Sequence, residues 1–113
     1  MQMARVIDEA LRQELDELVA NMCKALNDPK RLLVLYALAD GPHTVSELCE
    51  ILDAPQSNTS QHLAVLRNAG MVETERNGNS VIYSLRHPKV VAIVDDLRGI
   101  MTDELDRRRA VSA

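Results

Sequence analysis

The chain has 113 residues, 46% of them apolar, and its only aromatic residues are two tyrosines, so we expect one domain with a modest aliphatic core. No signal-peptide pattern and no apolar run near the ~20 residues of a membrane-spanning helix are present, which predicts a cytoplasmic protein without a membrane partner. The net charge of −4 disfavours non-specific binding to nucleic acid, although residues 54–87 carry three arginines against two glutamates.

Two helices are predicted in the first third of the chain. Residues 4–27 have apolar side chains at steps of three and four between charged ones, which is typical of an amphipathic helix. Asp28 and Pro29 suit the N-cap and the first position of a second helix. Residues 30–39 are apolar on most sides, so this second helix should be central and buried.

Residues 45–70 are predicted to form a helix-turn-helix. Thr44 and Glu47 suit a capping box at the start of its first helix. Pro55 interrupts the apolar pattern and suits the first turn of the second helix, because proline lacks an amide hydrogen. Gly70 suits the end of that helix, where the backbone needs a positive φ.

The second helix of this motif, residues 56–69, is the predicted recognition helix. Thr59, through its methyl group, continues an apolar row with the leucines that follow it. The opposite face carries short or planar polar groups, namely Ser57, Asn58, Gln61 and His62. Asn and Gln side chains can pair with adenine in the DNA major groove, so this face suits base recognition. The alternative is an ordinary solvated face of a small helical domain.

A β-hairpin is predicted over residues 71–86. The apolar period changes to two, and Asn77-Gly78-Asn79 separates the two alternating stretches, which is a strong hairpin signal because Asn and Gly both accept a positive φ. A hairpin directly after a recognition helix is the wing of a winged helix. Arg76 and the tip of the hairpin would contact the DNA backbone or minor groove.

A last helix is predicted over residues 88–108, and we expect the end of the chain, residues 106–113, to fray. This helix and residues 4–27 carry more apolar surface than a single chain of this size can cover. The predicted fold class is therefore mostly α with a β-hairpin wing, a winged helix-turn-helix in the order α-α-α-α-β-β-α. Residues 1–113 would form a single DNA-binding domain that dimerises through its first and last helices.

Four runs of the sequence resemble the ArsR/SmtB family of transcriptional repressors. They are Ala25-Leu-Asn-Asp-Pro-Lys-Arg-Leu32, Val45-Ser-Glu-Leu48, Ser60-Gln-His-Leu-Ala-Val-Leu-Arg67 and Ala69-Gly-Met-Val72. The resemblance implies a winged-helix homodimer that occupies double-stranded operator DNA and leaves it when an inducer binds. By position it implies DNA contacts from Ser57, Asn58, Thr59, Ser60, Gln61, His62, Arg67, Arg76 and Asn79.

The sensing sites of that family do not carry over to this sequence. One family metal site needs several thiolates, and its positions here are Thr44, Ser46 and Cys49. A second lies on the last helix, and its positions here are His87, Lys89, Ile100 and Asp103. A single thiolate cannot make the first site, and lysine and isoleucine cannot ligate zinc at the second. Some members of that family form a persulfide with a pair of cysteines, and the corresponding positions here are Tyr36 and Thr102. We therefore expect no metal site and no cofactor, and the inducer stays unknown.

Cys23 and Cys49 are the only cysteines. Both are expected to be small core residues, with Cys23 on the buried side of the first helix and Cys49 inside the helix-turn-helix. The sharper alternative is a repressor that uses the two thiols to sense redox state or a soft metal. Double substitution by serine with no effect on operator binding or induction would exclude that alternative.

Three other hypotheses concern the whole chain. The acidic balance favours a winged-helix module that binds a protein instead of DNA. A repressor without a chemical sensor, controlled by its abundance or by a small molecule in the dimer interface, is also compatible with the sequence. An enzyme is not expected, because the sequence shows no nucleophile–base pair, no phosphate-cradling glycine loop and no paired catalytic carboxylates.

Overall fold

The computed structural model describes residues 7–112. In chain order its elements are α2 (Glu9–Leu18), a π-helical turn η1 (Val19–Cys23), α3 (Lys24–Leu26), α4 (Pro29–Ala39), β1 (His43–Thr44), α5 (Val45–Leu52), α6 (Gln56–Asn68), β2 (Val72–Asn77), β3 (Ser80–Leu85) and α7 (Lys89–Ser112). The start of the predicted first helix, at residues 4–6, lies outside the described residues. The predicted mostly helical chain with one β-hairpin is confirmed.

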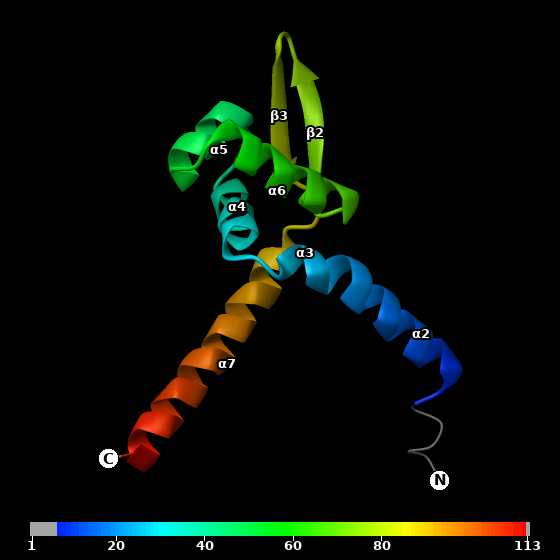
Figure 1. Ribbon diagram of the computed structural model, residues 1–113, viewed down its shortest axis with the longest axis vertical. Helices are drawn as coiled ribbons and strands as arrows, with labels where there is room; N and C mark the ends of the chain where they lie inside the picture. The colour runs from blue at the N-terminus through cyan, green and yellow to red at the C-terminus, as the bar shows by residue number, and fades with distance from the viewer. Residues whose placement is uncertain (1–6, 113) are drawn as a thin grey trace.

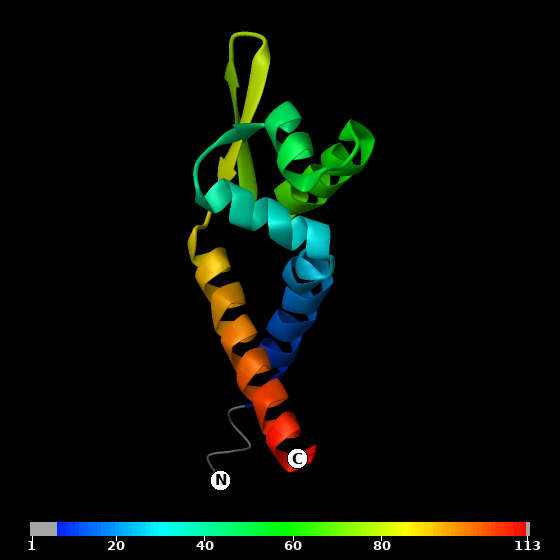
Figure 2. The same cartoon turned by 90° about the vertical axis from the view of Figure 1, so that its left-hand side faces the viewer.

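The molecule consists of a head and two arms (Figures 1 and 2). The head contains α4, α5, α6 and the small sheet. The N-terminal arm (α2, η1 and α3) and the C-terminal arm (α7) leave it in different directions. The Cα radius of gyration is 17.8 Å, whereas a compact chain of this length has about 13 Å. Much of the surface of both arms is therefore not covered by the rest of the chain.

The N-terminal arm is not the uninterrupted helix that the sequence predicts. Asp8 caps α2 by accepting a hydrogen bond from the Leu11 amide at 2.9 Å. A wider π-helical turn follows α2, and within it the Asn21 side-chain amide donates to the Glu17 carbonyl at 2.8 Å. A side chain that donates to the carbonyl four residues earlier competes with the backbone hydrogen bonds of the helix. This competition is a local reason for the irregular turn.

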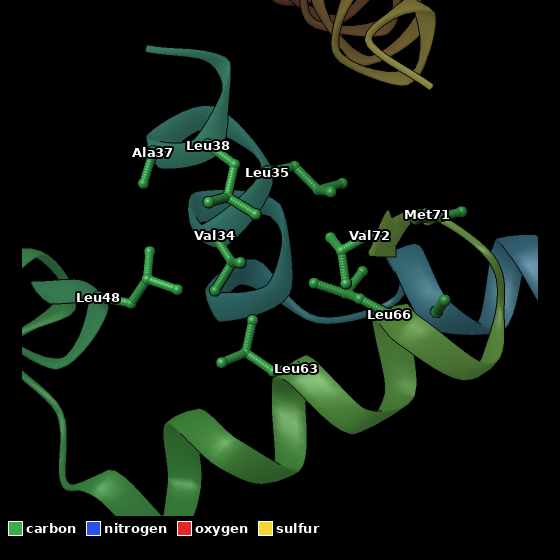
Figure 3. Close-up of a cluster of buried hydrophobic side chains, with 10 residues drawn as sticks. Val34, Leu35, Ala37, Leu38, Leu48, Leu63, Leu66, Met71 and Val72 are labelled. Carbon is green, nitrogen blue, oxygen red and sulfur yellow. The ribbon is translucent and has the colours of Figure 1, made fainter. Parts of the chain in front are cut away.

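The core of the head lies where α4, α5, α6 and β2 meet (Figure 3). Asp28 caps α4 by accepting from the amides of Lys30 and Arg31, and Pro29 occupies the first turn, as predicted. Four residues of this helix are buried, as predicted, but Leu33 is 53% exposed. The buried apolar cluster comprises Ala25, Val34, Leu35, Ala37, Leu38, Leu48, Leu63, Leu66, Met71 and Val72.

The turn chemistry of the helix-turn-helix follows the sequence closely. Thr44 and Glu47 form the predicted capping box at the start of α5. Asp53 ends α5 with a φ of 50°, a left-handed conformation that Asp tolerates better than most residues. Gly70 has a φ of 77° and donates to the Arg67 carbonyl, while the Met71 amide donates to the Leu66 carbonyl. These two bonds are the Schellman pattern, so the predicted end of α6 is confirmed.

The wing is the antiparallel pair of β2 and β3, joined at its tip by Gly78 and Asn79. Only Gly78 has a positive φ in this turn, whereas the sequence suggested positive φ at two residues. A positive φ at the first central position alone is the pattern of a type II′ turn. The sequence did not predict β1, whose residues His43 and Thr44 pair with β3 and widen the hairpin to three strands in the order β1-β3-β2.

The last helix, α7, continues to Ser112, so the expected fraying from residue 106 is wrong. Near its start Val90 and Val91 pack against the core, and Val94 is buried. The rest of α7 extends away from the head (Figure 1). Across the described residues, no helix combines the length and the apolar content needed to cross a membrane.

Candidate nucleic-acid interface

The outer face of α6 is polar and contains no acidic side chain. Ser57, Asn58, Ser60 and Gln61 are exposed, as predicted. Leu63 and Leu66 point the other way, into the core with α4 and β2 (Figure 3). The buried row therefore fixes the rotation of α6, and with it the direction in which the polar face points.

Thr59 corrects the predicted set of DNA contacts. Its exposed fraction is 0%, and its hydroxyl donates to the Pro55 carbonyl at 3.1 Å. The residue therefore belongs to the apolar row of α6 and cannot reach DNA. Its helical phase already indicated burial, and only the positional resemblance to the family placed it among the contacts.

The start of α6 has no side-chain cap, because Pro55 stands at the N-cap position and its side chain has no hydrogen-bond acceptor. The first backbone amides of the helix are therefore left without a partner from the cap. Gln56, the first residue of α6, is exposed there as well, although the sequence analysis did not single it out. A polar residue directly after the proline was the signal that could have identified it.

Arg67 lies in the last turn of α6 and is exposed. A cation at this end also interacts favourably with the helix dipole. Of the remaining predicted contacts, His62 lies on α6, and Arg76 and Asn79 lie on the wing.

The wing separates its charges onto two faces. Residues at alternate positions of a strand share a face, so Arg76 shares one with Thr74 and with Val72, which is buried in the core. Glu73 and Glu75 lie on the opposite face. Asn79 is exposed at the tip of the hairpin, which extends beyond the helices of the head (Figure 1).

His62 is the predicted contact that does not lie freely on the surface. It is half-buried, and its Nδ1 lies 3.4 Å from Nη1 of Arg31 on α4. The sequence did not predict this pair, because the two residues are 31 positions apart and nothing in either segment indicates the other.

A second group that the sequence missed joins α4 to α7. The Tyr36 phenol donates to the Asp95 carboxylate, and Arg98 donates to both, at 3.3 Å to Tyr36 Oη and 3.1 Å to Asp95 Oδ1. The Arg98 guanidinium also lies over the Tyr36 ring, 5.4 Å from its centroid. Hydrogen bonds with Tyr36 and then with Asp95 raise the pKa of Arg98 above its ordinary value, so this side chain stays cationic.

The two cysteines lie in different parts of the molecule. Cys23 is in η1 and Cys49 in α5, and both thiols are free. Cys49 is half-buried, but Cys23 is exposed, so its expected place in the core is wrong for the single chain. The apolar neighbours of Cys23 suggested a buried side, but no element among residues 7–112 covers that face of the arm. Within residues 7–112, no three His, Cys, Asp or Glu side chains come together so that they could hold a metal ion.

The chain is similar to known bacterial regulators. Residues 28–74 match the family model described as "Bacterial regulatory protein, arsR family". The chain is 38% identical over 85 residues to the HTH-type transcriptional regulator YgaV of Escherichia coli (strain K12), a match that covers 74% of this chain and 86% of the relative. Its fold is also similar to several solved structures.

Two of these structures illustrate the likeness. The crystal structure of the transcriptional repressor BigR from Xylella fastidiosa has a TM-score of 0.69 at 34% identity, covering 83% of this chain and 96% of that one. The solution structure of the homodimeric winged helix-turn-helix DNA-binding domain Mb0332 from Mycobacterium bovis has a TM-score of 0.74 at 25% identity, covering 89% and 93%.

These relatives are transcriptional regulators and not enzymes, and they do not favour the hypothesis of a protein-binding module. The combination of α5, α6 and the β2–β3 wing agrees with the winged helix-turn-helix named in the second structure. The chain belongs to the ArsR family of bacterial transcriptional regulators.

Proposed function

We propose that this chain is a repressor that binds double-stranded operator DNA as a homodimer in the cytoplasm and is released by an inducing signal of unknown chemistry. The observation that carries the proposal is the exposed, polar and acid-free face of α6, which a buried row on the other side holds in a fixed orientation. An α-helix with such a face fits the major groove, where base edges present hydrogen-bond donors and acceptors.

Dimerisation is supported by the apolar side chains of the two arms. On α7, Leu97, Ile100 and Met101 are 56%, 65% and 56% exposed, although they recur at helical spacing on one side of the helix. The N-terminal arm exposes further apolar side chains, namely Leu15, Leu18, Val19 and Met22. Contiguous apolar surface of this kind marks an interaction site, and a second copy would cover the same face of both chains. The relative from Mycobacterium bovis is described as homodimeric.

The proposed contacts fall into two groups. Ser57, Asn58 and Gln61 would read base edges in the major groove, with Ser60 beside them. Two side chains of α6, His62 and Arg67, and two of the wing, Arg76 and Asn79, would position the protein on the DNA backbone. Few cations are available to displace counterions, so binding to random DNA should be weak at physiological salt.

The experiment that tests this proposal compares two variants on the DNA upstream of the protein's own gene and on a scrambled duplex. Gln61→Ala should cost about 1–3 kcal/mol on the operator and loosen the sequence preference, because one base contact is lost. Arg76→Ala should weaken binding to both duplexes alike and reduce the salt dependence. Equal losses of the Gln61→Ala variant on both duplexes would show that Gln61 does not read bases.

A further inference from the structure

Arg31 is the most highly connected side chain between the N-terminal arm and the recognition helix. Its Nε donates to the Ala25 carbonyl at 2.6 Å, and its Nη2 donates to the Lys24 carbonyl at 3.1 Å. Both carbonyls belong to α3, and the Lys24 carbonyl also accepts from the Asn27 amide at 3.2 Å. The Arg31 side chain is only 15% exposed, so these bonds hold its guanidinium in one place.

One nitrogen of Arg31 remains and faces α6. Nη1 lies 3.4 Å from Nδ1 of His62 and 4.0 Å from Oδ2 of Asp28. A guanidinium has only donors, so Nδ1 of His62 must be the acceptor in this contact. A neutral imidazole carries one proton, and that proton is then on Nε2.

Asp28 and Arg31, both from the start of α4, face the His62 ring. Desolvation raises the pKa of the Asp28 carboxyl, but hydrogen bonds from the backbone amides of Lys30 and Arg31 outweigh it, so the pKa lies below its ordinary value. Asp28 therefore stays ionised and balances the guanidinium, while a proton on His62 Nδ1 would face the donor of Arg31.

We propose that Arg31 is a positioning residue for DNA binding: it keeps His62 in the Nε2–H tautomer, so that Nε2 donates a hydrogen bond to a phosphate oxygen of the operator. The role of His62 on DNA rests on the proposed function, whereas its tautomer is a property of the free protein. Because Arg31 also binds the end of α3, the position of the N-terminal arm and the orientation of His62 are joined through one side chain.

The tautomer is measured by two-bond ¹H–¹⁵N correlation spectra of the full-length protein without DNA at about pH 8. His43 is an internal control, because its Nδ1 lies 3.6 Å from Glu47 Oε1 and has no contact with Arg31. We expect the Nε2–H form at His62. In Arg31→Gln protein His62 should become a mixture of tautomers while His43 stays unchanged. The Nδ1–H form at His62, or the same His62 tautomer ratio with and without Arg31, would overturn the proposal.

A second test leaves Arg31 intact and does not depend on the stability of its variants. In His62→Gln the side-chain amide can place a donor near the former Nε2, whereas in His62→Asn the shorter side chain reaches only the position of Nδ1. We expect His62→Gln to bind DNA within about threefold of the unchanged protein, and His62→Asn to bind about tenfold more weakly on operator and scrambled duplex alike. Equal affinity of the two variants, or a loss confined to the operator, would contradict the phosphate contact. If the unchanged protein does not select its operator, the proposed function fails, and the tautomer measurement still decides the role of Arg31.

Discussion

Tyr36 and Asp95 are 59 residues apart, yet the phenol of one donates a hydrogen bond to the carboxylate of the other. The bond joins α4, the central helix of the head, to α7, the helix that extends from it (Figure 2). Arg98 completes the group by donating to both side chains. A displacement of α7 would therefore be transmitted directly to α4, the helix on which α5 and α6 pack.

Tyr36→Phe should lower the free energy of unfolding by about 1 kcal/mol, because the Asp95 carboxylate loses one hydrogen bond but remains in water. Urea unfolding followed by circular dichroism measures this difference. The control is Tyr83→Phe, since the Tyr83 ring packs on the core but its hydroxyl has no hydrogen bond within the described residues. If both variants lose the same free energy of unfolding, the hydrogen bond from Tyr36 to Asp95 does not contribute to stability.

Gly70→Ala should destabilise the protein by about 1–2 kcal/mol, because an L-residue with a side chain is strained at the φ of 77° that ends α6. A Cβ at this position would meet no atom within 4 Å, so the loss reports backbone strain alone. Gly99→Ala is the matched control, since it lies inside α7, also has open space around it, and should gain up to about 1 kcal/mol. Thermal unfolding measures the stability of both variants. Equal melting temperatures of the two would contradict the Schellman end of α6.

Stability should fall as the pH drops through the acid range, in part through the capping box. The backbone amide of Thr44 holds the pKa of the Glu47 carboxyl below its ordinary value of 4.5. A carboxyl with a lowered folded-state pKa stabilises the fold above its unfolded-state pKa, and this contribution disappears as the pH falls through the folded-state value. Glu47→Gln should therefore be less stable than the unchanged protein near neutral pH, and the gap should close in acid.

The measurement for that prediction is the melting temperature between neutral pH and pH 2. Glu50→Gln serves as the control, because Glu50 is exposed on the same helix but takes no part in the capping box. A gap between the Glu47→Gln variant and the unchanged protein that stays constant with pH would show that the carboxylate does not cap α5.

Ile100→Glu should weaken the proposed dimer by at least about tenfold without unfolding the chain. Ile100 is exposed in the single chain, so a charge there is solvated in the monomer but would be buried without a partner in the dimer. Sedimentation velocity over a range of protein concentrations measures the dissociation constant. Arg107→Glu, also exposed on α7, is the charge-changing control and should remain dimeric. If the unchanged protein is monomeric, the proposed dimer is excluded. If the Ile100→Glu variant dimerises as strongly as the control, the interface lies elsewhere.

The ends of several helices could be predicted because their signals are local. Asp28 and Pro29 start α4, Thr44 and Glu47 start α5, and Gly70 ends α6 through groups within a few residues of one another. The outer face of α6 followed from helical periodicity, and the one wrong contact, Thr59, contradicted that periodicity.

The remaining features depend on contacts between distant segments. The pairs Arg31–His62 and Tyr36–Asp95 arise only when helices pack, and β1 forms only because β3 presents a free edge to two residues. The exposure of Cys23 was missed because an apolar neighbourhood in the sequence does not say whether the covering surface belongs to the same chain.

The central claim is selective operator binding through α6. Fluorescence anisotropy of the protein on labelled DNA from upstream of its own gene, against a scrambled duplex of the same composition, tests it most directly. The titration is run with reduced protein, with thiol-oxidised protein and with added zinc, so that a role of Cys23 and Cys49 in induction would appear as release by oxidation or zinc. We predict tight binding to the upstream DNA and weak binding to the scrambled duplex with reduced protein. Equal affinity for the two duplexes under every condition would contradict the account.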